Sequence, residues 1–173
     1  MLESSIGQLR QGVRMGGVFA LECYDPNKQL KWHDTAVKLV TNEGLQHALD
    51  VLFTAATQTA AWHVGLMDDT PDVTAGATLA TADGFTEFSE YTGGRQEFVD
   101  VRAVNTVTNS ASTVSFAITG VGGGVGGALL AAASAGTSTI LLCGAALTGG
   151  NRAVATGDTV VVTYSFTAAD DGA

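Results

Sequence analysis

The chain has 173 residues, which is enough for one domain with a substantial hydrophobic core. Hydrophobic residues make up 46% of the chain, charged residues make up 14%, and 22 residues are glycine, so the composition excludes a disordered chain and predicts many turns. The net charge is −9 and only eight residues are lysine or arginine, so the chain as a whole repels the phosphate backbone of nucleic acids. We therefore expect no nucleic-acid partner.

The N-terminal region, residues 1–16, is polar with scattered apolar side chains and is expected to form an arm. Such an arm can order against a partner or remain frayed, and the sequence fits both descriptions. The segment Met1–Arg14 lacks the apolar stretch of a signal peptide, so we expect synthesis in a reducing cytoplasm. Residues 17–173 are expected to form a single domain.

A strand-like pattern begins at Val18. The turn-forming residues Asp25–Lys28 separate the stretch Gly17–Tyr24 from a second strand-like stretch that starts at Leu30. This arrangement predicts a β-hairpin.

One short helix is predicted, over about residues 43–55. Its apolar residues follow the i, i+3, i+4, i+7, i+8 spacing of a single stripe, and they are Leu45, Ala48, Leu49, Leu52 and Phe53. Thr41 and Asn42 can cap the start of this helix.

The next strand is predicted around Trp62, Val64 and Leu66, which alternate with smaller or polar residues and indicate a half-buried strand. It runs into an acidic loop that contains Asp68, Asp69 and Asp72. These carboxylates could hold a structural calcium ion, but they lack the regular spacing of an EF-hand loop, and a solvated loop is the preferred interpretation.

Further alternating stretches follow in the second half of the chain, over residues 96–103, 113–119 and 159–167. Several short strands with one helix predict a mainly β fold, an antiparallel β-sandwich or jelly roll. No acidic residue occurs in Val101–Gly157, so we expect this part to be covered, either by its own domain or by a neighbouring subunit.

The segment Gly127–Leu147 carries no charge over 21 residues, which raises the question of a transmembrane helix. Glycine, serine and threonine divide the segment in its middle, around Gly136. Two buried strands around a turn are therefore predicted, and no membrane partner is expected.

A GxGxxG pattern at Gly122, Gly124 and Gly127 resembles a dinucleotide-binding turn. The acid that should follow about 20 residues later to bind a ribose is missing, and the residues after Gly127 make a poor helix. We predict a flexible glycine loop between strands and no cofactor.

Other reactive residues do not form a recognisable motif. His33 beside Asp34, together with His63, has no metal-ligand or catalytic spacing. Cys23 and Cys143 form no CxxC pair and are predicted to be free buried thiols. No metal site is expected.

Two further clusters are candidates for binding or catalysis. Glu87 and Glu90 could act as paired carboxylates, but a surface turn is the simpler interpretation. Trp32, Trp62 and Tyr91 could form a sugar-stacking platform, although core packing is favoured. The sequence therefore offers no catalytic residues, and no enzyme activity is expected.

Several stretches taken together resemble a known family, namely Lys31–Asp34, Leu39–Leu45, Trp62–Leu66, Gly84–Glu87 with Tyr91 and Arg95, and Gly157–Tyr164. In this order they resemble small virion structural proteins of tailed bacteriophages, some of which are similar to jelly-roll capsid decoration (cement) proteins. The resemblance covers roughly residues 30–168. It implies a homo-oligomer, most often a trimer, that binds the major capsid protein on the outer surface of an icosahedral head and stabilises it.

The candidate contact surfaces under this interpretation are residues 1–16 and the uncharged loops Gly120–Gly127 and Ala135–Ser138. A tail or fibre-attachment subunit would share the same β-rich, self-assembling character. A carbohydrate-binding sandwich is the third possibility that the sequence leaves open.

Overall fold

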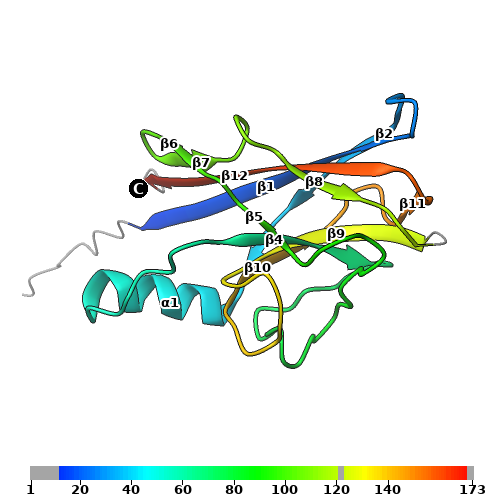
Figure 1. The fold of residues 1–173 in the computed structure, drawn as a ribbon. Helices are drawn as coiled ribbons and strands as arrows, with labels where there is room; N and C mark the ends of the chain where they lie inside the picture. The colour runs from blue at the N-terminus through cyan, green and yellow to red at the C-terminus, as the bar shows by residue number, and fades with distance from the viewer. Residues whose placement is uncertain (1–11, 121–122, 171–173) are drawn as a thin grey trace, which may run out of the picture.

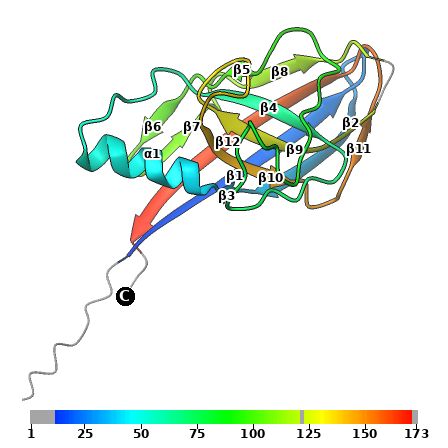
Figure 2. The same ribbon diagram turned by 90° about the horizontal axis from the view of Figure 1, so that it is seen from below.

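Two antiparallel β-sheets packed face to face form the protein, as the computed structural model in Figures 1 and 2 shows. The structure describes residues 12–120 and 123–170. The expected β-sandwich is therefore confirmed. Most of the expected N-terminal arm, residues 1–11, lies outside the described residues, whereas Val13–Gly16 already belong to the first strand.

The first sheet, sheet A, has six strands in the order β2-β1-β12-β7-β6, with β8 also pairing with β12. Their bounds are β1 Val13–Tyr24, β2 Leu30–Val37, β6 Val101–Ala103, β7 Thr106–Thr108, β8 Val114–Ala117 and β12 Thr159–Asp170. The two longest strands, β1 and β12, pair along their entire lengths and form the centre of the sheet.

The second sheet, sheet B, has six strands in the order β3-β10-β9-β4-β5, with β11 also pairing with β9. Their bounds are β3 Leu39–Val40, β4 His63–Asp68, β5 Gln96–Glu97, β9 Gly123–Ala131, β10 Leu141–Ala146 and β11 Arg152–Val154. The uncharged segment forms β9 and β10, which pair around a turn as predicted.

The predicted hairpin is formed by β1 and β2. Its turn is stabilised by Asp25, whose carboxylate accepts hydrogen bonds from the backbone N–H groups of Asn27 and Gln29, both at 2.8 Å. Lys28 adopts a positive φ of 64° at the last position of the turn. Asp and Asn favour such turns because their side chains bond to the backbone nearby.

The core between the sheets follows the two-residue period of the strands. Sheet A buries alternate residues of β1 and β12 where these strands face sheet B, and sheet B contributes apolar side chains from its central strands; these are Phe19, Leu21, Cys23, Val160, Val162 and Tyr164, and Val64, Leu66, Val125 and Leu130. Each large aliphatic or aromatic side chain that is fully buried stabilises the fold by about 1.5–3 kcal/mol.

A second, smaller core covers the outer face of sheet B. Met67, Leu129 and Leu141 point to this face, and the long segment between β4 and β5 packs onto them through Leu79 and Phe85. Strand β4 is therefore buried on both faces, not half-buried as its alternation suggested. The segment covers β9 and β10, so part of the acid-free region is shielded by its own chain.

The glycine-rich run does not form the predicted loop, because Gly123–Gly127 belong to β9, where Gly124–Gly127 are buried. A Cβ on Gly126 would lie 1.5 Å from the backbone oxygen of Asp69, and one on Gly127 would lie 2.3 Å from that of Ala145. Glycine is required here because neighbouring backbone lies directly on the strand. Gly122 of the GxGxxG pattern lies outside the described residues.

The stretch over residues 96–103 was predicted as one strand but is divided between the sheets. It pairs with sheet B at Gln96–Glu97 and with sheet A at Val101–Ala103. Phe98, between the two, turns into the main core, whereas Val99 is exposed. Alternation alone cannot show where a chain crosses from one sheet to the other.

The predicted helix, α1, spans Asn42–Phe53. Thr41 is its N-cap, with Oγ1 accepting a hydrogen bond from the N–H of Gly44 at 3.0 Å. Glu43 accepts a hydrogen bond from the N–H of Leu141 at 2.9 Å, so the first turn is fastened to β10. The last turn lies away from this anchor, at one end of the sandwich (Figure 1).

Candidate functional site

The histidines examined as possible catalytic or metal groups do not form a site. His33 and Asp34 are neighbours in β2, and successive strand residues point to opposite faces. Asp34 instead pairs with Arg152 at 2.7 Å. Burial alone would raise its pKa, but hydrogen bonds from Arg152 and from the backbone lower the pKa overall.

The acidic residues also serve structural roles. Glu87 binds Arg95 through two hydrogen bonds of 2.9 and 2.5 Å, and the buried guanidinium also donates to the carbonyls of Ala133 and Gly136. This arrangement ties the long β4–β5 segment to the β9–β10 turn. Within residues 12–120 and 123–170, no group of three or more His, Cys, Asp or Glu side chains is placed so that it could hold a metal ion. This holds for the acidic loop Asp68–Asp72 as well.

The three aromatic residues weighed as a sugar platform lie on separate elements and are partly buried against the main core. The indole N–H of Trp32 donates to the carbonyl of Ala153, and Tyr91 packs edge-on against Phe116. Trp62 contacts the ring of His47. Core packing, the favoured interpretation, fits this arrangement.

Both cysteines are free and buried, as predicted. Burial raises the pKa of the Cys23 and Cys143 thiols to about 11. No helix in the described part of the chain is long and apolar enough to cross a membrane.

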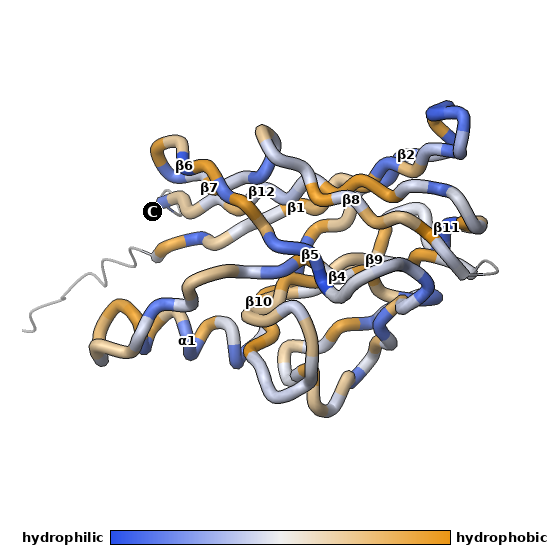
Figure 3. Tube along the Cα trace, in the orientation of Figure 1, coloured by the Kyte–Doolittle hydropathy of each residue, from blue (hydrophilic) through white to orange (hydrophobic). Residues whose placement is uncertain are grey.

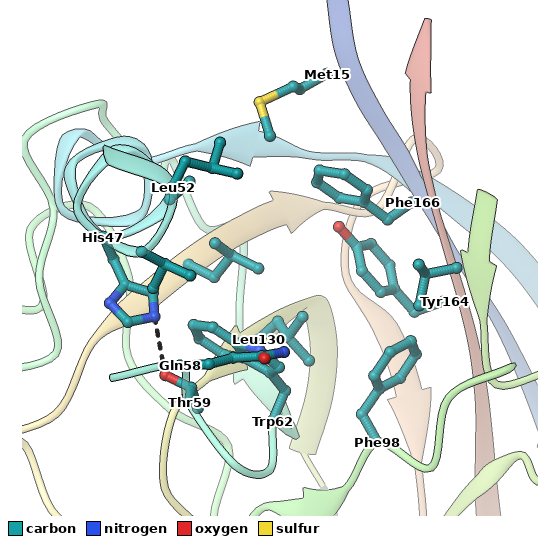
Figure 4. A pocket seen from close by; sticks show the side chains of 14 residues that line it. Met15, His47, Leu52, Gln58, Thr59, Trp62, Phe98, Leu130, Tyr164 and Phe166 are labelled. Atoms are coloured by element: carbon teal, nitrogen blue, oxygen red, sulfur yellow. Dashed lines mark hydrogen bonds between the residues drawn. The ribbon is translucent and has the colours of Figure 1, made fainter. Parts of the chain in front are cut away.

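The most distinctive cavity is an apolar cleft between α1 and sheet A, shown in Figure 4. Its volume is about 310 Å³, roughly the space of ten water molecules. Met15, Tyr164 and Phe166 line one wall, α1 forms the other, and Trp62 and Leu130 lie between them. Polar side chains in the lining are few, namely His47, Gln58 and Thr59 besides the Tyr164 hydroxyl.

The cleft exists because β1 and β12 continue past the end of sheet B. They remain paired from Gly17 and Phe166 out to Val13 and Asp170. Val13 and Met15 lie on the same side of β1 as the core residue Phe19, by the two-residue period. Beyond the end of sheet B their faces remain open, and 74% of the Val13 surface is exposed.

A buried lysine contacts Phe166, one of the residues that line this cleft. Lys38, between β2 and β3, places its Nζ 3.6 Å from the ring centre of Phe166. This Nζ is buried and has no hydrogen-bond partner among the described residues. Burial lowers the pKa of Lys38 to about 8.

The apolar stripe of α1 was expected from its spacing, but most of it faces outward. Leu52 and Phe53 are 72% and 79% exposed, and of these two only Leu52 also lines the cleft, together with Ala48 and Val51. Other large apolar side chains are exposed at the same end of the molecule. We call this set the apolar end; it comprises Val13, Met15, Leu49, Leu52, Phe53, Val101 and Val104.

The opposite end of the sandwich differs in character. Figure 3 shows hydrophilic residues at the tip of the β1–β2 hairpin and hydrophobic residues at the β6–β7 turn and the last turn of α1. Exposed apolar side chains that gather on one surface indicate an interaction site more strongly than the same number scattered singly. The apolar end is therefore the strongest candidate functional surface in the described residues.

Sequence reasoning did not find this surface, although it found the helix that forms part of it. The helical stripe shows which residues share a face, but not whether the protein itself covers that face. The comparisons with known proteins add no family, because no family model matches the chain. No curated protein matches it either.

Proposed function

We propose that this protein is a non-enzymatic structural component of a bacteriophage virion, a decoration protein that binds the outside of the capsid as a homo-oligomer. The observation that carries the proposal is the apolar end, a surface suited to protein contacts, on a chain whose described residues hold no group of side chains that could bind a metal ion. The sequence resemblance to decoration proteins gives the partner, the major capsid protein.

The proposed mechanism needs only buried area. A stable protein interface buries roughly 1,200–2,000 Å² in total. An oligomer that bridges several capsid subunits makes several such contacts at once, so weak individual contacts combine into strong attachment. Opening the shell would then require their loss, which is how a decoration protein stabilises a head against internal pressure.

One of the sequence-derived contact surfaces changes under the observed fold, and another remains. Buried Gly124–Gly127 cannot contact a partner, whereas the turn Ala135–Ser138 is exposed and remains a candidate. The apolar end joins the turn as a candidate. The acidic remainder of the surface keeps the free protein soluble.

The experiment compares capsid binding by the natural chain and by variants with an altered apolar end. Leu52→Ser combined with Phe53→Ser removes two large exposed side chains, and we expect loss of self-association and of co-sedimentation with shells that lack the protein. Leu30→Ser, at an exposed position beside the polar hairpin turn, is the matched control and should bind normally. Equal binding by both variants would remove the apolar end from the proposal, and attachment to tails instead of heads would favour a tail subunit.

A further inference from the structure

The apolar cleft is a groove without an occupant in the described residues. Its walls present Met15, Val51 and Phe166 to a space of about 310 Å³, enough for several aliphatic side chains. The described chain begins at Gly12, three residues before Met15 on the cleft wall. Residues 1–11 therefore attach to the protein at the cleft's own end.

The N-terminal segment has a sequence that suits this groove. Leu2, Ile6 and Leu9 give the segment three large aliphatic side chains, which suit an apolar groove. Eleven residues reach at most about 36–40 Å when extended. That length is sufficient to reach a neighbouring molecule.

The charges at the helix end also match the segment. The last turn of α1 contains Asp50 and no basic residue, so it combines a carboxylate with the negative end of the helix dipole. Arg10, next to Leu9, would place a positive charge beside this turn when Leu9 enters the cleft. This pairing orients the segment along the groove.

We propose that the cleft of each molecule receives residues 1–11 of a neighbouring copy in the same oligomer. Strand β1 directs the chain outward at Val13, so filling its own cleft would require a reversal within a few residues. A neighbouring copy at this end also covers Phe53, which is 79% exposed and does not line the cleft, whereas the molecule's own segment inside the cleft would leave Phe53 exposed. The same contact repeated around a symmetry axis closes the oligomer.

This inference rests on the self-association in the proposed function, but not on capsid binding. Its test is a disulfide between Leu9→Cys and Leu52→Cys in one full-length chain, oxidised under native conditions. The natural cysteines, Cys23 and Cys143, are fully buried and do not compete. Each single-cysteine variant is a control, and Leu9→Cys with Gln46→Cys is a second control because Gln46 is exposed on α1 but does not line the cleft.

Exchange between copies predicts covalent multimers on a non-reducing gel from the Leu9→Cys, Leu52→Cys chain and few from the controls. Deletion of residues 1–11 should reduce the light-scattering mass two- to three-fold, to that of one chain, while cooperative unfolding persists. A disulfide formed within a single chain would show that the segment fills its own cleft. Absence of any disulfide would show that the cleft has another occupant. Either result overturns the inference. If the disulfide forms within single chains but light scattering still gives an oligomeric mass, the proposed self-association stands. Co-sedimentation with capsid shells tests the rest of the proposed function separately.

Discussion

Replacing Lys38 by methionine should stabilise the protein at neutral pH. The ammonium group is buried beside Phe166 without a hydrogen-bond partner in the described part of the chain, and burial lowers the pKa from 10.5 to about 8. This difference corresponds to at most about 3 kcal/mol of destabilisation, which solvent screening of the partly buried side chain reduces to about 1–2 kcal/mol. Methionine has a similar length and fills the same space without a charge.

One interaction opposes the gain. The contact with the Phe166 ring at 3.6 Å is a cation–π interaction worth about 0.5–2 kcal/mol, which the substitution removes. Because that ring satisfies none of the three N–H donors, we expect desolvation to dominate and the net gain to be about 1 kcal/mol. For a protein of this size, such a gain raises Tm by about 2–4 °C.

The pH dependence gives the sharper assay. Below pH 8 Lys38 is charged in both the folded and the unfolded chain, and the buried charge destabilises the folded state in full. Between pH 8 and 10.5 the unfolded chain binds the proton more tightly than the folded chain does, so the free energy of unfolding rises with pH. Urea unfolding at pH 6.5 and pH 9 should show this rise in the natural chain relative to Lys38→Met, at pH values below the raised pKa of the neighbouring Cys143 thiol. A less stable variant at pH 6.5, with no difference in slope, would refute the reasoning.

Three further substitutions test other parts of the fold. Arg95→Lys loses the bidentate hydrogen bonds to Glu87 and should lower the free energy of unfolding by about 2–4 kcal/mol in urea. The β4–β5 segment should also be cleaved earlier by a protease, and an unchanged cleavage rate would contradict the role of Arg95 in holding this segment against the β9–β10 turn. Gly126→Ala should lower Tm or abolish soluble expression, because its Cβ would overlap the Asp69 backbone, whereas Gly136→Ser, at an open position with positive φ, should cost only about 1–2 kcal/mol. Asn109→Ala removes two buried hydrogen bonds to the β12 backbone and should cost about 2–3 kcal/mol by thermal unfolding, and a loss under 0.5 kcal/mol would contradict that role.

The elements that could be predicted from the sequence are those whose signals are local. The β1–β2 hairpin depends on Asp25 binding its own turn, and α1 depends on the Thr41 cap and a helical stripe. The two-residue period placed Val160 and Val162 in the core correctly. Each signal lies within a few residues of the structure that it predicts.

The remaining features depend on contacts between distant parts of the chain. Nothing near Met67 indicates that Leu79 and Phe85 will cover its face of sheet B. The exposed position of Phe53 follows from where sheet B ends and α1 is anchored, and these are properties of the assembled sandwich. The candidate functional surface was therefore missed at the sequence level, although its helical residues Leu49, Leu52 and Phe53 had been identified.

The measurement that tests the central claim most directly is sedimentation of capsid shells that lack the protein, mixed with increasing amounts of it. The account predicts that oligomers sediment with the shells up to a saturating ratio fixed by the shell's symmetry, and that serine at Leu52 and Phe53 prevents this. A protein that remains in the supernatant at every concentration would contradict the proposed role on the head.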